Sequence, residues 1–162
     1  MYYDYVIAGL RLRSDIDLVA VGIRGFQPFV ADVEGEAECI VTHNPMMDIA
    51  ALGEFHELAT SYVYEADADS CFGRTTAGYL YSIQRRRPES PVTYFHIERD
   101  SGHVTTNIET ADNIDVSILR FGIWVMFGVV MASRGAIAIH SSTIVADGRA
   151  ILFLGESGTG KS

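Results

Sequence analysis

One uncharged segment constrains the fold most: residues 121–133 (FGIWVMFGVVMAS), which Arg120 and Arg134 bound on either side. An α-helix that crosses a bilayer needs about 20 apolar residues, so this segment is too short to span one. We therefore expect a buried core helix over residues 116–133, with Asp112 or Asn113 as its N-cap and Gly135 as its stop signal.

The residues before this helix have the composition of short strands. They are rich in β-branched and aromatic side chains and are interrupted by glycine and proline. A hairpin is expected around residues 99–102, and residues 45–59 are expected to form a short helix. Asp67, Asp69 and the run Arg85-Arg86-Arg87 are expected in solvated loops. The expected strands are residues 2–10, 17–23, 29–33, 36–42, 61–65, 77–83, 92–98 and 103–108.

Two further strands, residues 136–145 and 149–154, are expected after the helix. Asp147-Gly148 lies between them, and this dipeptide tolerates the positive φ angles of a tight hairpin turn. The second strand carries the continuous apolar run ILFL and is therefore expected to be buried. The fold class predicted is α+β, with a β-rich region over residues 1–112 followed by the helix and this hairpin over residues 113–162.

The charge balance excludes several classes of partner. The chain has 12 Lys and Arg against 21 Asp and Glu, a net charge of −9. An acidic surface does not displace the counterions of nucleic acid and is not attracted to anionic lipid, so neither nucleic acid nor a membrane is expected as a partner. The N-terminus has no basic region of an export signal, and Cys39 and Cys71 have no metal-binding or disulfide spacing. These features favour a cytoplasmic protein.

A phosphate-binding motif follows the last expected strand. The sequence GESGTGKS matches the pattern G-x-x-x-x-G-K-[ST], in which glycines allow successive backbone N–H groups to surround a phosphate. The lysine of such a loop contacts the β- and γ-phosphates, and its last hydroxyl helps to hold Mg²⁺. The nucleotide-binding residues predicted are Gly155, Glu156, Ser157, Gly158, Thr159, Gly160, Lys161 and Ser162, with Ser162 as the magnesium contact.

The alternative is a glycine-rich turn with a chance lysine. Lys161 is the only lysine among twelve basic residues, the other eleven being arginine. A flexible ammonium therefore occurs at the one position where a phosphate-binding loop requires it. This favours the phosphate-binding interpretation.

Residues 138–162 (AIHSSTIVADGRAILFLGESGTGKS) resemble the HPr kinase/phosphorylase and phosphoenolpyruvate carboxykinase superfamily, and HPr-kinase-like bacterial proteins in particular. His140-Ser141-Ser142, the turn Asp147-Gly148 and the glycine-rich loop carry the resemblance, which is loose elsewhere. It implies an incomplete α/β kinase core that binds ATP and Mg²⁺ and transfers a phosphoryl group to a hydroxyl of an unidentified protein or small molecule. His140 matches a family histidine near the transferred phosphate and is the candidate catalytic residue, although a packed strand histidine is the alternative. No ligand spacing links His43, His56, His96 and His103.

In this family an acidic pair that serves as base and metal contact lies after the loop, and this sequence ends at Ser162. We therefore expect residues 1–162 alone to bind ATP weakly and not to catalyse, and to associate into homo-oligomers through exposed apolar surface. Two other interpretations stay open. The β-rich region is a non-catalytic binding module with a vestigial loop, or the chain is a fragment of a carboxykinase-like enzyme.

Overall fold

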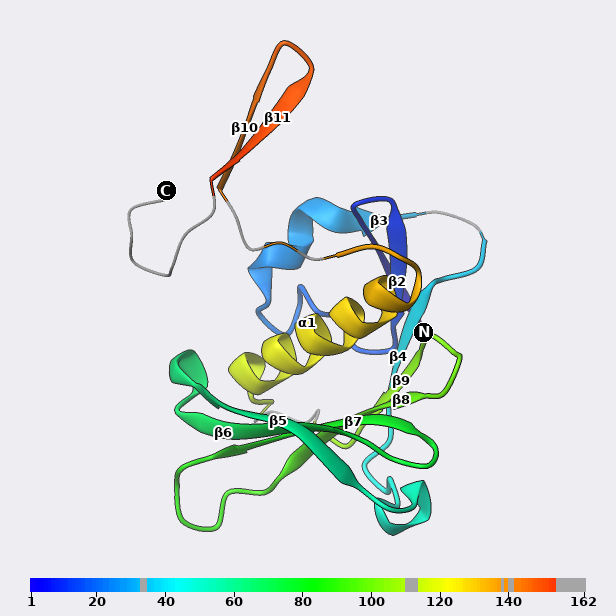
Figure 1. Cartoon of the computed structure of the whole chain (residues 1–162), viewed down its shortest axis with the longest axis vertical. Helices are drawn as coiled ribbons and strands as arrows, with labels where there is room; N and C mark the ends of the chain where they lie inside the picture. Colours follow the sequence, from blue (N-terminus) through cyan, green and yellow to red (C-terminus); the bar gives the residue numbers. More distant parts are fainter. Residues whose placement is uncertain (33–34, 110–113, 138, 140–141, 154–162) are drawn as a thin grey trace. The chain divides into compact units, whose positions relative to one another are not determined.

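The structure, a computed structural model, describes residues 1–32, 35–109, 114–137, 139 and 142–153. The chain divides into two compact units, Met1–Val130 and Met131–Ser162. The first contains a large mixed sheet and most of the one long helix seen in the described residues, and the second contains a two-stranded hairpin (Figure 1). The fold class is therefore α+β, as predicted.

Nine strands form the sheet of the first unit. They are β1 (Tyr3–Ile7), β2 (Leu10–Ser14), β3 (Val30–Ala31), β4 (Cys39–His43), β5 (His56–Val63), β6 (Ala68–Arg74), β7 (Gly78–Arg85), β8 (Thr93–Glu98) and β9 (His103–Thr106). Their order across the sheet is β3-β1-β2-β4-β9-β8-β7-β6-β5. β4 pairs in parallel with both of its neighbours, β2 and β9, and all other pairs are antiparallel. The predicted hairpin around residues 99–102 is confirmed as β8 and β9.

The helix α1 (Val116–Ser133) spans the residues predicted for it. Asp115 caps its start, because the Oδ1 atom of Asp115 accepts a backbone N–H of the first turn at 3.2 Å. The predicted caps Asp112 and Asn113 lie outside the described residues. Gly135 takes a φ of 77° just after the last turn, so the predicted stop signal is confirmed.

One side of α1 packs closely on the sheet. A Cβ atom built at Gly122 would lie 2.1 Å from the ring of Phe95 on β8, so only glycine permits this approach. The ring of Trp124 lies 5.1 Å from that of Phe26, measured between centroids. By length and composition α1 would also qualify as a membrane-spanning helix, but core helices of soluble proteins pass the same test. The buried residues of α1 are Ile118, Leu119, Gly122, Ile123, Met126, Phe127 and Val130.

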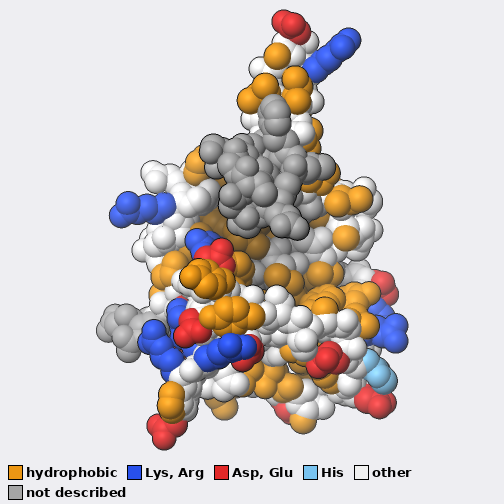
Figure 2. Space-filling view, turned by 60° about the vertical axis from the view of Figure 1, so that its left-hand side comes forward, with side chains coloured by type: hydrophobic (Ala, Val, Ile, Leu, Met, Phe, Trp, Pro, Cys, Tyr) orange, Lys and Arg blue, Asp and Glu red, His pale blue; other side chains and the backbone are white. Residues whose placement is uncertain are grey.

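The second unit contains a hairpin at the predicted turn, formed by β10 (Ser142–Ala146) and β11 (Arg149–Phe153). The first strand was expected from residue 136, but residues 136, 137 and 139 are not in a strand. Asp147 and Gly148 take φ angles of 50° and 71° at the turn, as expected for this dipeptide. Figure 2 shows hydrophobic side chains along the hairpin and charged side chains at its turn. The expectation that the last strand is buried is wrong for Ile151 and Leu152, which are 47% and 45% exposed. Two strands alone leave both of their faces open to solvent.

Several segments of the first unit differ from the prediction, and three of them have a local cause. Residues 17–23 form turns instead of a strand, because the Asp17 carboxylate accepts the N–H groups of Val19 and Ala20 at 3.1 and 2.9 Å. Residues 45–59 contain only a 3₁₀ turn, Ala50–Leu52, before β5 begins at His56. The expected first strand is divided by Ala8-Gly9, both with positive φ, into the hairpin of β1 and β2.

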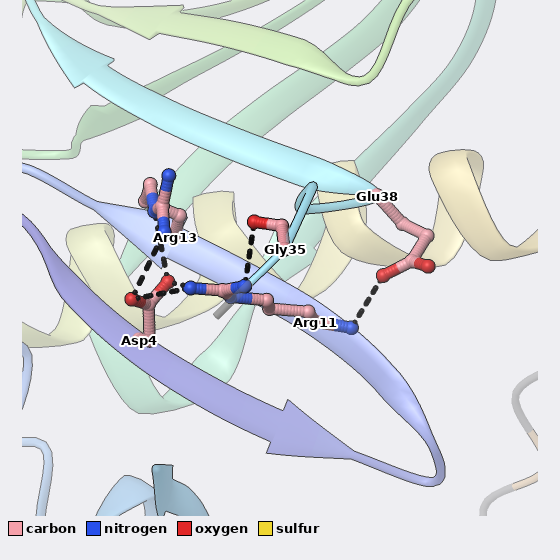
Figure 3. A network of polar contacts seen from close by, with 5 residues as sticks. All are labelled: Asp4, Arg11, Arg13, Gly35 and Glu38. Atoms are coloured by element: carbon pink, nitrogen blue, oxygen red, sulfur yellow. Dashed lines mark hydrogen bonds and ion pairs between the residues drawn. The ribbon is translucent and has the colours of Figure 1, made fainter. Parts of the chain in front are cut away.

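A network of charged side chains ties β1 and β2 to the segment before β4 (Figure 3). The guanidinium of Arg11, which is 6% exposed, donates two hydrogen bonds to the carboxylate of Asp4, at 2.9 and 2.8 Å. Arg13 donates to the same carboxylate at 2.9 and 3.2 Å. Arg11 also donates to the carbonyl of Gly35 at 2.6 Å, and its backbone N–H donates to Glu38 at 2.7 Å. The buried arginine is therefore paired and its hydrogen bonds are directed at fixed acceptors.

Candidate functional site

The predicted nucleotide-binding residues, Gly155, Glu156, Ser157, Gly158, Thr159, Gly160, Lys161 and Ser162, lie outside the described residues, as does His140. The structure describes the strand that precedes the loop in the sequence. β11 ends at Phe153, and the tight turn at Asp147-Gly148 pairs it with β10 over five residue pairs. A hairpin therefore precedes residues 155–162 in the sequence, and the phosphate-binding loop expected after it stays a prediction.

The histidines of the described part of the chain do not converge. His56 begins β5, His103 begins β9, His43 ends β4 and His96 lies within β8. No group of three or more His, Cys, Asp or Glu residues able to hold a metal ion occurs among the described residues. His96 is buried, and this burial lowers its pKa. Its Nε2 atom has no hydrogen-bond partner in the described residues. This histidine is thus held in its neutral form by its surroundings.

A hollow of about 680 Å³ lies on one face of the sheet over β5 to β8 and is lined mainly by polar side chains. We call it the polar hollow. The cross-strand registers bring Thr60, Cys71, Ser82 and Tyr94 into one row across these four strands. The lining comprises Thr60, Ser61, Tyr62, Asp69, Ser70, Cys71, Ser82, Gln84, Arg86, Val92 and Tyr94.

An ion pair and a stacked aromatic ring form one wall of the polar hollow. The guanidinium of Arg86 donates to the carboxylate of Asp69 at distances from 2.6 to 3.0 Å. Its carbon lies 4.3 Å above the ring of Tyr62, whose hydroxyl donates to Asp67 at 2.7 Å. The hydrogen bond from Arg86 lowers the pKa of Asp69, and the hydrogen bond to Asp67 raises the pKa of Tyr62. The Asp69 carboxylate therefore stays ionised, and the guanidinium of Arg86 balances its charge. This arrangement favours ligand binding over proton transfer.

The sequence prediction missed this wall. Asp69 was expected in a solvated loop, but it lies in β6 because β6 pairs with β5 and β7 on both sides. The run Arg85-Arg86-Arg87 was expected in a loop as well. This is wrong for Arg85, which ends β7 and binds the carboxylate of Asp115 and the carbonyl of Ala66, whereas Arg86 and Arg87 lie outside the strands as expected. Asp69 is opposite Gln84 in the register of β6 and β7, and Arg86 lies just beyond the end of β7, so no local charge pattern in the sequence marked this pair.

A second hollow, of about 380 Å³, lies on the other side of β5, next to α1. We call it the apolar hollow, because Phe72, Tyr81, Phe121 and Val125 supply much of its wall. Thr60, Ser61, Tyr62 and Ser70 line both hollows, so the two are separated by β5 and β6 only.

Comparison of the chain with known protein families, with curated proteins and with solved structures gives no significant match.

Proposed function

We propose that residues 155–162 belong to a site that binds the phosphates of ATP, in the manner of HPr-kinase-like proteins. Phosphoryl transfer from ATP to a hydroxyl acceptor is proposed for a protein that also has the acidic pair of that family, and not for residues 1–162 alone. The observation that carries the proposal is the sequence GESGTGKS directly after an apolar strand. In this proposal Gly155, Gly158 and Gly160 allow the backbone N–H groups to surround the phosphates, Lys161 pairs with the β- and γ-phosphates, and Ser162 contacts Mg²⁺.

The described hairpin supports the proposal without testing it. Phosphate-binding loops follow a strand, and β11 ends at Phe153, two residues before Gly155. His140 is proposed to orient the transferred group, on the resemblance alone. The acceptor is proposed to be a protein or small-molecule hydroxyl. The cytoplasm is the proposed location, because Cys39 and Cys71 have no disulfide spacing.

Equilibrium binding of Mg-ATP tests the loop. Lys161→Ala removes the only lysine of the sequence, and we expect it to weaken binding at least tenfold because a charge-assisted contact to phosphate is lost. Arg149→Ala is the matched control, since it removes one positive charge from the exposed start of β11. Equal affinities of the wild type and Lys161→Ala would refute the nucleotide site.

The polar hollow favours a second candidate function, that of a non-catalytic binding module. Its paired Asp69 and Arg86, together with several hydroxyl groups, suit a neutral polar ligand better than a nucleotide. If this is the function, Asp69→Ala abolishes ligand binding and Lys161→Ala leaves it unchanged.

A further inference from the structure

β5 is the last strand of the sheet at one edge. It is eight residues long, and every residue from His56 to Tyr62 is exposed. No strand of the described part of the chain pairs with its outer side. An edge strand of this length offers a row of N–H and C=O groups that can pair with another chain.

Most of this edge lacks the features that usually prevent such pairing. Residues 58–64 (LATSYVY) contain no charge and no proline, although one fifth of the whole chain is charged. Exposed edges are ordinarily interrupted by lysine, by proline or by a bulge. The one irregularity is a bulge between Glu57 and Ala59, so the stretch from Ala59 to Val63 keeps regular pairing with β6. The other edge strand, β3, is only two residues long.

Both faces of β5 border a hollow. The polar hollow lies on one face and the apolar hollow on the other, and Thr60, Ser61 and Tyr62 line both. Side chains of a strand added to β5 would alternate between these two faces. Such a strand fits best when one set of its side chains is apolar or small and the other set carries hydroxyl groups.

We propose that the strand added to β5 is β5 of a second copy of this chain, paired antiparallel about a two-fold axis normal to the sheet. This symmetry keeps each face on its own side. Ala59, Ser61 and Val63 of the copy therefore continue the face of the apolar hollow, and Thr60 and Tyr62 continue the face of the polar hollow.

Charge favours this occupant over others. The paired stretch is neutral, so two copies bring no like charges together along it, and it offers no counter-charge that would select an acidic or basic partner. With the axis at Thr60, Glu57 of each copy is opposite Val63 of the other. The two Glu57 side chains then lie about 20 Å apart, at about 3.4 Å per residue. This separation exceeds the Debye length at physiological ionic strength, so salt screens the repulsion between them.

The test is the mass of the particle in solution, measured by light scattering and by sedimentation. We expect the wild type to be a dimer at about 100 μM. Thr60→Lys places two ammonium groups next to the two-fold axis, and we expect it to be monomeric with an unchanged far-ultraviolet circular dichroism spectrum. Val30→Lys is the control, because it adds the same charge to the 60% exposed Val30 at the opposite edge.

A monomeric wild type would overturn the proposal. So would a dimer that Val30→Lys disrupts and Thr60→Lys does not, because the contact would then lie at the β3 edge. The outcome is independent of the nucleotide site, since Lys161→Ala leaves the β5 edge intact and Thr60→Lys leaves the loop intact.

Discussion

The carboxylate of Asp4 is the group whose removal tests the packing of the first unit most sharply. Hydrogen bonds from Arg11 and Arg13 hold the pKa of Asp4 at about 2, below its ordinary value of 3.8. The Asp4 side chain is 17% exposed and that of Arg11 only 7% exposed, so solvent screens this pair little. Asp4→Asn keeps the shape of the side chain and removes its charge.

The magnitude follows from the difference between the two pKa values. A tenfold change in proton affinity corresponds to about 1.4 kcal/mol, so the ionised carboxylate contributes about 2 kcal/mol to the free energy of unfolding. Because the pKa is lower in the folded state, this contribution is complete above about pH 5. It is lost as the pH falls from the unfolded value of 3.8 towards the folded value of about 2. We therefore expect Asp4→Asn to be less stable than the wild type by about 2 kcal/mol at pH 7, and most of this difference to disappear by pH 2.5.

Urea denaturation followed by the fluorescence of Trp124, the only tryptophan, measures this difference. Trp124 is a suitable reporter because its ring packs against that of Phe26 in the same unit. Asp69→Asn is the control: its carboxylate pairs with Arg86 at the surface, with side chains 60% and 54% exposed, and we expect no measurable change. Parallel pH profiles of the wild type and Asp4→Asn between pH 7 and 2.5 would refute the reasoning.

Two further predictions concern the helix and the buried histidine. Gly122→Ala should destabilise the protein by about 1–3 kcal/mol, because the added Cβ would meet the ring of Phe95. Gly128→Ala should stabilise the protein by up to about 1 kcal/mol, because a Cβ at Gly128 would meet no other atom. Equal effects of the two substitutions in urea denaturation would show that α1 does not approach β8 as described. The folded pKa of His96 is lowered by burial, so its contribution to stability is present above about pH 6.5 and is lost as the pH falls below that value. We expect the unfolding free energy of His96→Leu to fall less between pH 7 and pH 5 than that of the wild type. Equal slopes of unfolding free energy against pH for the two proteins would contradict this prediction.

The features fixed by local sequence were predictable. The helix over residues 116–133 follows from an uncharged run with glycine after it, and the turn at Asp147-Gly148 follows from a dipeptide that tolerates positive φ. The hairpin of β8 and β9 has a local turn as well. In each case the residues that decide the structure are neighbours in the chain.

The features that depend on distant pairing were not predictable. β6 was missed because its sequence ADSCFGR is polar, and it becomes a strand by pairing with β5 and β7. The parallel position of β4 joins it to β2, about 27 residues earlier, and to β9, about 63 residues later, and nothing in the local sequence encodes these pairings. The wall formed by Asp69, Arg86 and Tyr62 depends on the pairing of β6 with β5 and β7. The polar hollow was therefore not predicted, because β6 was not predicted.

The most direct test of the central proposal uses the fact that Lys161 is the only lysine of the sequence. An ATP derivative with a lysine-reactive acyl phosphate at its terminal phosphate transfers its acyl group to an amine held beside that phosphate. Mass spectrometry of the labelled protein can then distinguish Lys161 from the N-terminal amine. We predict acylation of Lys161 that excess Mg-ATP suppresses. Labelling of Lys161 no faster than that of the N-terminus, or labelling that Mg-ATP does not suppress, would contradict the assignment of residues 155–162 as a nucleotide site.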